Sequence, residues 1–100
     1  MIILKIRTMI APEKKTEFEQ AVRYIIDMKL KQKTGVFRRI YQASDDPMSY
    51  LYIEEWDSRE EITAYMSSDA YRALIGAMDF LGQVTEAQII TTSKVENILP

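Results

Sequence analysis

Short runs rich in β-branched, aromatic and other apolar residues occur in four stretches of the chain, and each stretch predicts a β-strand. The stretches span residues 2 to about 9, 36–43, 49–56 and 83 to about 95. The turn sequence Asp45-Asp46-Pro47 separates the second stretch from the third, because aspartates favour turn positions and proline fixes its own φ angle. These two strands should therefore form a hairpin.

Between the strands, apolar residues recur every three or four positions, which predicts helices. The first helix begins near Pro12 and should end at Thr34-Gly35, since glycine favours helix ends. Its apolar stripe consists of Phe18, Ala21, Val22, Ile25 and Met28. A capping box at residues 58–61 begins a short second helix, and Ser67-Ser68-Asp69 caps a third that should end near Gly82.

The resulting order, β-α-β-β-α-β, predicts an α+β protein with a ferredoxin-like antiparallel sheet, covered by helices on one face. Both faces of the third strand carry large groups. Tyr50, Tyr52 and Trp56 lie on one face, and Leu51 and Ile53 lie on the other. An exposed apolar face of this extent marks an interface. We therefore expect a homodimer in which two sheets pack face to face; the alternative is a monomer with scattered exposed aromatic residues.

Composition narrows the chemistry of this chain, whose length predicts a single domain over residues 1–100. With 13 basic and 15 acidic residues it lacks the positive charge that nucleic acids and anionic membranes attract. It has no cysteine and no histidine, so the usual metal ligands and the usual general base are missing. No apolar run approaches the roughly 20 residues of a membrane span. Lys5 and Arg7 make the amino-terminal segment a poor signal peptide, and we expect a cytoplasmic protein.

Two motifs carry a family resemblance that covers nearly the whole chain. The sequence EEWDSREE at residues 54–61, followed by SSDAYR at residues 67–72, resembles the antibiotic biosynthesis monooxygenase (ABM) family of dimeric α+β barrels. Trp56, Ser58 and Ser68 in these motifs are explained by a strand end and two helix caps. The resemblance implies oxidation of phenolic, quinol or anthrone-type substrates by dioxygen, often without metal or flavin, and we expect no cofactor.

One branch of the same family degrades haem with an asparagine, a tryptophan and a histidine. This chain has Tyr65 in place of the tryptophan and an apolar residue near Ile75 in place of the histidine, and its first strand has no asparagine. Haem degradation by that mechanism is therefore not expected.

Oxygenation without a cofactor needs a group that accepts a proton from the substrate, and donors that stabilise the resulting anion. Glu54 is the predicted proton acceptor, and Arg39 or Arg7 is the predicted anion stabiliser. The predicted ligand-binding residues are Arg7, Tyr41, Tyr52, Trp56, Tyr65 and Tyr71.

Other interpretations of the same residues stay open. The protein is a monooxygenase of a small aromatic, phenolic or quinol substrate, a non-catalytic dimer that holds a small apolar ligand, or an isomerase or lyase of polyketide-like substrates. In the simplest interpretation, the aromatic side chains only pack, and Arg39 and Glu54 form an inert ion pair. An enclosed cavity lined by tyrosine and arginine would favour a small-molecule site, and a filled core would favour a structural role.

Overall fold

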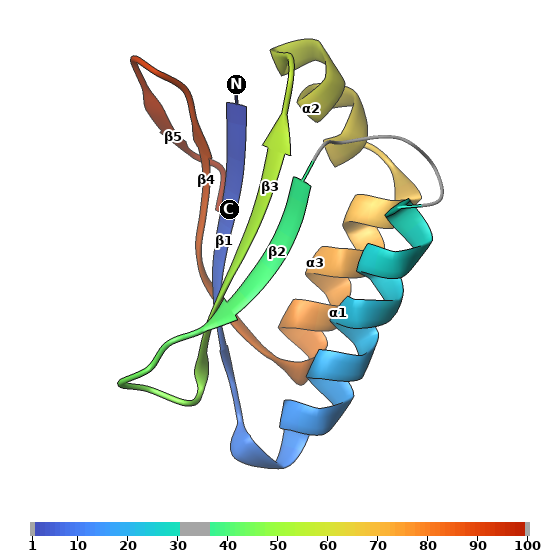
Figure 1. Ribbon diagram of the computed structural model, residues 1–100, viewed down its shortest axis with the longest axis vertical. Helices are drawn as coiled ribbons and strands as arrows, with labels where there is room; N and C mark the ends of the chain where they lie inside the picture. Colours follow the sequence, from blue (N-terminus) through green and yellow to red (C-terminus); the bar gives the residue numbers. More distant parts are fainter. Residues whose placement is uncertain (1, 31–36, 100) are drawn as a thin grey trace.

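The computed structural model describes residues 2–30 and 37–99, and in that part of the chain three α-helices lie on one face of a five-stranded sheet (Figure 1). The strands are β1 (Ile2–Ile10), β2 (Phe37–Gln42), β3 (Ser49–Trp56), β4 (Gly82–Ile90) and β5 (Val95–Asn97). The helices are α1 (Lys15–Leu30), α2 (Arg59–Met66) and α3 (Asp69–Leu81), with a 3₁₀ turn, η1 (Pro12–Lys14), before α1. The strand order is β2-β3-β1-β4-β5, with antiparallel neighbours. The predicted α+β, ferredoxin-like arrangement is confirmed. One further strand, β5, lies at the edge of the sheet beside β4.

Serine caps begin α2 and α3, as the sequence predicts. The Ser58 hydroxyl accepts a hydrogen bond from the backbone N–H of Glu61 at 3.2 Å, and the Ser68 hydroxyl accepts one from Tyr71 at 3.2 Å. Each cap satisfies a backbone donor that has no partner within the first turn of its helix. Because α2 starts only three residues after β3 ends, its start is fixed relative to the sheet.

Gly82 joins α3 to β4, where the sequence predicts the helix to end. A Cβ atom at this position would lie 2.1 Å from the carbonyl oxygen of Met9 on β1. Only a residue without a side chain allows the two backbones to approach so closely.

The prediction of one long final strand is wrong. β4 ends at Ile90, and a tight turn follows in which the backbone N–H of Thr91 donates to the carbonyl of Lys94 at 2.8 Å. β5 then runs back along β4 as a short edge strand. The sequence TTSK at residues 91–94 misled the prediction, because threonine favours strands while hydroxyl side chains also support turns.

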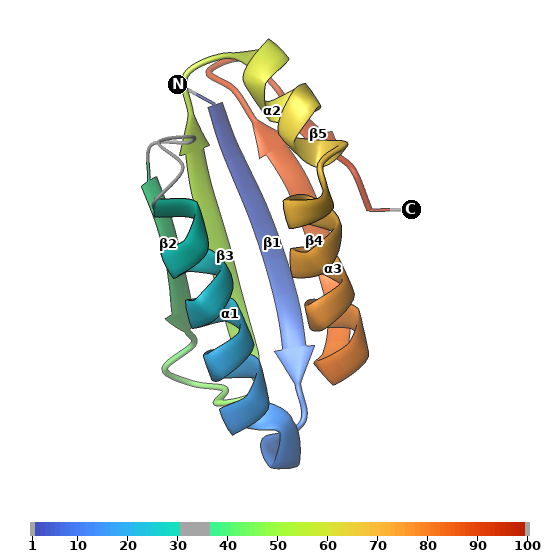
Figure 2. The same ribbon diagram turned by 90° about the vertical axis from the view of Figure 1, so that its right-hand side faces the viewer.

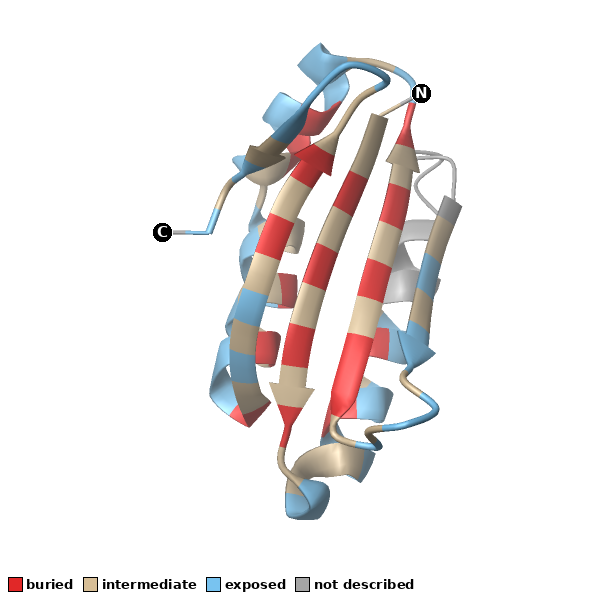
Figure 3. Cartoon of the chain, turned by 90° about the vertical axis from the view of Figure 1, so that its left-hand side faces the viewer, coloured by how far each residue is buried: buried red, intermediate tan, exposed pale blue. Residues whose placement is uncertain are grey.

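The core lies between the sheet and the helices. Buried and partly exposed residues alternate along β1 and β3, and α1 and α3 cover one face of the sheet (Figure 2). The apolar residues that are at most 1 % exposed are Leu4, Ile6, Ile10, Phe18, Val22, Ile62, Leu74, Met78 and Ile89. The helices leave the opposite face uncovered, as predicted (Figure 3). We call that face the open face.

Two sequence predictions fall outside the described residues: the end of the first helix at Thr34-Gly35 and the start of the second strand at Val36. In the described part of the chain, no helix has both the length and the apolar character needed to cross a bilayer. The cytoplasmic location expected from the sequence stays a prediction.

Candidate functional site

A buried carboxylate, that of Glu54, lies between the sheet and the helices and accepts hydrogen bonds from three aromatic side chains. Glu54 has no exposed surface. The indole N–H of Trp56 donates to its Oε1 at 2.8 Å. The hydroxyls of Tyr52 and Tyr65 both donate to Oε2, that of Tyr65 at 2.8 Å. The Nε of Arg38 lies 3.4 Å from the same Oε2. We call these five residues the Glu54 cluster.

Three elements build the cluster. Tyr52, Glu54 and Trp56 alternate along β3, so all three side chains point to the helices. Arg38 comes from β2, where the antiparallel register places it directly opposite Glu54. Tyr65 comes from the last turn of α2, the helix that follows β3 directly.

The aromatic rings form a series from the core toward the surface. The rings of Trp56 and Tyr65 are 4.8 Å apart between centroids. Tyr65 meets half-buried Tyr71 edge to face at 5.4 Å. The guanidinium carbon of Arg38 lies 5.5 Å from the Trp56 ring and 6.0 Å from the Tyr65 ring, within the range of cation–π attraction.

Burial and negative charge keep the phenols protonated. Burial raises the pKa values of Tyr52 and Tyr65 far above the ordinary value of 10, and the nearby Glu54 carboxylate raises them further. The same two causes, in the same order, raise the pKa of Tyr71. The side chains of Arg38 and Glu54 are 2 % and 1 % exposed, so each charge is balanced within a region that excludes water.

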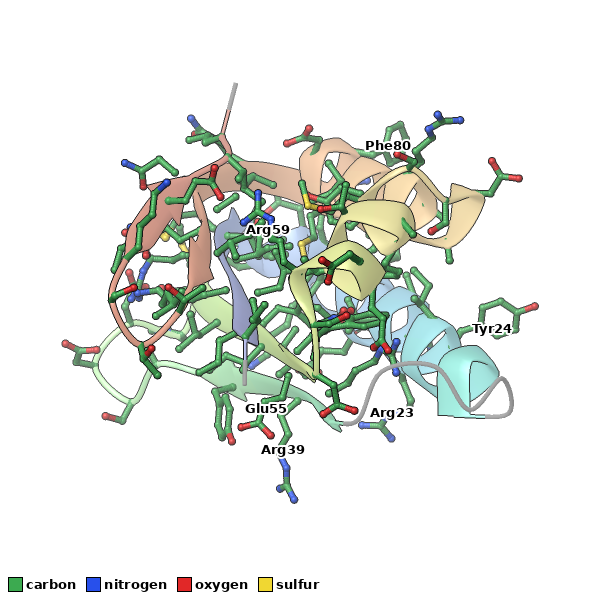
Figure 4. All side chains as sticks on the ribbon, turned by 90° about the horizontal axis from the view of Figure 1, so that it is seen from above. Arg23, Tyr24, Arg39, Glu55, Arg59 and Phe80 are labelled. Carbon is green, nitrogen blue, oxygen red and sulfur yellow. The ribbon has the colours of Figure 1, made fainter. Side chains whose placement is uncertain are left out.

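The predicted pair of Arg39 and Glu54 is wrong. Arg39 lies opposite Ile53 and is exposed on the open face, extending away from the ribbon (Figure 4). Its neighbour Arg38 lies opposite Glu54 instead. A displacement of one residue turns a strand side chain to the other face of the sheet, so only one of two adjacent arginines reaches the carboxylate.

Sequence reasoning missed Arg38, because the register of the hairpin, which identifies this residue, is visible only in the hydrogen bonds beside the turn. The backbone N–H of Ala43 donates to the carbonyl of Ser49 at 2.9 Å beside the turn. Counting five residues outward from each of these positions pairs Arg38 with Glu54, as the register shows. The turn position therefore selects the arginine.

Two other predicted ligand-binding residues also lie on the open face. Arg7 is opposite Glu86, with its Nε 3.9 Å from the carboxylate, and Lys5 lies 3.1 Å from the same oxygen. Tyr41 is 48 % exposed and lies opposite Leu51. Of the predicted site residues, the structure thus brings together Tyr52, Glu54, Trp56, Tyr65 and Tyr71, and it places Arg7, Arg39 and Tyr41 elsewhere.

A pocket of about 250 Å³ lies apart from the cluster, where the start of α2 faces the β4–β5 turn. Its lining residues are Arg59, Ile89, Thr91, Lys94 and Glu96. Arg59 and Glu96 form an ion pair across it at 2.6 Å. This pocket is not the tyrosine- and arginine-lined cavity expected from the sequence for a small-molecule site. The space around Glu54 is filled by side chains, so a ligand reaches that carboxylate only when a covering side chain moves.

The Glu54 cluster combines a carboxylate, a cation, and phenol and indole donors in one desolvated space. A carboxylate within hydrogen-bond distance of a hydroxyl can accept its proton, and a nearby cation can stabilise the anion that forms. Among the described residues, no group of three or more acidic side chains is placed to hold a metal ion.

Comparison of the fold with solved structures shows the same architecture in several proteins. SnoaB, a cofactor-independent oxygenase from Streptomyces nogalater, aligns with a TM-score of 0.77 and 16 % identity, covering 93 % of each chain. A conserved protein from Methanosarcina mazei Go1 has a TM-score of 0.74 and 21 % identity over 89 % of this chain and 87 % of that one. Rv0793 from Mycobacterium tuberculosis has a TM-score of 0.75 and 14 % identity over 90 % and 92 %.

Sequence comparison identifies the family. No curated protein matches the chain. The sequence model of the antibiotic biosynthesis monooxygenase family matches residues 1–77, which include the whole Glu54 cluster and Tyr71. The resemblance seen in the two sequence motifs is confirmed: the chain belongs to the antibiotic biosynthesis monooxygenase family.

Proposed function

We propose that this protein is a cofactor-independent monooxygenase that acts on a small aromatic substrate of the phenol or quinol type. The observation that carries the proposal is the buried Glu54 carboxylate, held by phenol and indole donors and by Arg38 in a chain of this family. The similarity in fold to SnoaB, a cofactor-independent oxygenase, supports the proposal.

Tyr65 indicates how a phenol fits this site. Its ring lies beside Trp56, its hydroxyl donates to Glu54 at 2.8 Å, and the Arg38 guanidinium lies 6.0 Å from the ring. A phenolic substrate offers the same ring and the same hydroxyl. In this proposal, Tyr65 turns outward with α2 toward Tyr71, and the substrate takes its place against Trp56 and Glu54.

Two members of the cluster, Glu54 and Arg38, then act on the bound substrate. Glu54 accepts the acidic proton of the substrate, and Arg38 stabilises the electron-rich anion that remains. The anion reduces dioxygen directly. In an anthrone-type substrate, which is the keto tautomer of a phenol, a ring CH₂ becomes a carbonyl: the carbon loses two hydrogens and gains one oxygen atom, and the second oxygen atom leaves with those hydrogens as water. The four electrons that dioxygen takes up come from the substrate, so no further reductant is needed.

Oxygen consumption with a panel of hydroquinones and anthrones tests the proposal. The Glu54→Gln variant should lower kcat/KM by about 10²–10⁴-fold, the usual contribution of a positioned proton acceptor. Glu55→Gln, the adjacent acidic position on the open face, is the matched control and should keep the activity. If the panel raises the melting temperature while no oxygen is consumed, the protein is a ligand-binding module and the enzyme proposal fails.

We also propose that two copies of the chain form a homodimer through the open face. This face carries partly buried apolar side chains among charged ones; the apolar residues are Ile3, Met9, Leu51, Ile53 and Ile90. An apolar surface of this kind on a sheet marks an interface. Light scattering should give twice the mass of one chain. Ile53→Lys should give the monomer, whereas Phe80→Lys, at an 83 % exposed position on α3, should leave the dimer intact.

A further inference from the structure

Three side chains that can each lose one electron share a single carboxylate in this protein. Tyr52 and Tyr65 donate phenolic hydrogens to Glu54 Oε2, and Trp56 donates its indole hydrogen to Oε1. An oxidised phenol becomes a strong acid, so its oxidation is easiest where a base lies within hydrogen-bond distance. The 2.8 Å bond from Tyr65 to Glu54 provides that base without any movement of the backbone.

The same tyrosine is connected to the surface. Tyr65 is 8 % exposed and lies 5.4 Å, centroid to centroid, from the half-buried Tyr71. Trp56 is 4.8 Å from Tyr65 on the inner side. Adjacent rings at these distances allow an electron to pass from Tyr65 to Tyr71, whereas the Glu54 cluster itself is closed to larger molecules.

We propose that the Glu54 cluster is a proton-coupled oxidation site, in which a neutral tyrosyl radical forms at Tyr65 and is held in the core. A one-electron oxidant of the peroxyl-radical class takes a hydrogen atom from the Tyr71 hydroxyl and becomes a hydroperoxide. An electron then passes from Tyr65 to the Tyr71 radical, which takes a proton from water, leaves hydroxide, and is restored. The phenolic proton of Tyr65 moves to Glu54 Oε2, so one radical is consumed, one radical is formed, and charge is conserved.

The charges around the cluster favour Tyr65 over Trp56 as the radical site. Arg38 lies closer to the Trp56 ring than to the Tyr65 ring, at 5.5 Å against 6.0 Å, and its positive charge opposes a cation radical. Tyr65 avoids this repulsion because it gives its proton to the oxygen that its hydroxyl already contacts. The resulting acid can donate the hydrogen bond back to the phenoxyl oxygen, which keeps the cluster in place.

The experiment uses the whole protein without substrate and photogenerated tris(bipyridine)ruthenium(III) as the oxidant, followed by electron paramagnetic resonance. The wild type should show a tyrosyl signal that narrows when ring-deuterated tyrosine is incorporated. Tyr65→Phe should abolish the long-lived signal. Tyr71→Phe should slow its formation. Tyr24→Phe, at a 67 % exposed position on α1, is the matched control and should leave it unchanged (Figure 4).

The Glu54→Gln variant tests the proton acceptor, since an amide can accept a hydrogen bond but not keep the proton. Radical formation at Tyr65 should slow by about 100-fold, within the range for a positioned base. The proposal is overturned if the tyrosyl signal survives unchanged in Tyr65→Phe. It is also overturned if the rate of radical formation is unchanged in a Glu54→Gln variant that keeps the wild-type circular dichroism spectrum. The inference does not depend on the proposed oxygen chemistry. If the radical forms but no oxygen is consumed with the hydroquinones and anthrones, this inference stands and the monooxygenase proposal fails.

Discussion

Replacing Glu54 by glutamine should destabilise the fold strongly, because Glu54 is the acceptor at the centre of a buried polar cluster. Loss of one partner from a buried ion pair costs about 3–5 kcal/mol. Glutamine keeps one acceptor oxygen, which can replace Oε2. Its NH₂ group then faces the Trp56 indole N–H, so a donor meets a donor where the wild type has a hydrogen bond of 2.8 Å. A buried donor without an acceptor costs about 1–3 kcal/mol. This cost is part of the expected total of about 3–5 kcal/mol.

Equilibrium unfolding in urea measures this change as a difference in the free energy of unfolding. For a domain of this size, about 3–5 kcal/mol corresponds to a fall in melting temperature of at least about 12 °C. Tyr65→Phe removes one hydrogen bond to a charged acceptor and should cost less, about 1.5–3 kcal/mol. Glu55→Gln, on the open face of the same strand, should stay within about 0.5 kcal/mol of the wild type.

A loss below about 1 kcal/mol for Glu54→Gln would refute this reasoning. Such a result would mean that the carboxyl group is already uncharged in the folded protein, since a neutral carboxylic acid and an amide exchange at little cost. The proposed role of Glu54 as a proton acceptor would then be refuted as well.

The remaining predictions concern pH, backbone approach, helix capping and register. Folding raises the pKa values of Tyr52 and Tyr65, so above pH 10 the unfolded chain loses protons that the folded chain keeps. The contribution of these tyrosines to the free energy of unfolding is therefore full below pH 10 and falls above it. A Tyr52→Phe/Tyr65→Phe variant should flatten that fall in urea titrations at alkaline pH. Gly82→Ala should lower the melting temperature clearly, because its Cβ would meet a backbone carbonyl of β1 at 2.1 Å; a wild-type melting curve would contradict that contact. Ser68→Ala should cost about 1 kcal/mol through loss of the α3 cap, measured by urea unfolding, and Ser68→Gly should recover part of it if the cap is the cause. Arg39→Gln should leave the tyrosine ultraviolet difference spectrum unchanged, and a change there would place Arg39 in the cluster.

The charged and aromatic residues of β3 show what sequence could predict about the site. Because side chains alternate along a strand, positions 52, 54 and 56 had to share a face, whatever the rest of the chain did. The bulky residues at these positions identified the face that the helices cover. The serine caps at positions 58 and 68 fixed where α2 and α3 begin, and so which tyrosines could approach that face.

The choice between Arg38 and Arg39 depended on register, which alternation alone leaves open. Both residues lie on β2, and either would pair with β3 if the hairpin turn were one residue longer or shorter. The break between β4 and β5 was hidden for a related reason: threonine and serine suit both strands and turns, and pairing with a neighbour decides between them.

The sequence by itself determined the order of the elements as far as β4, the face of β3 that is buried, and the caps that position Tyr65 and Tyr71. These features follow from local backbone geometry, which acts over a few residues. Tertiary structure alone decided that Arg38 balances Glu54, that Arg7, Arg39 and Tyr41 lie on the open face, and that four side chains close around one carboxylate. Those contacts join strands and a helix across the fold, and burial gives them their strength, because a carboxylate removed from water must find its partners within the protein.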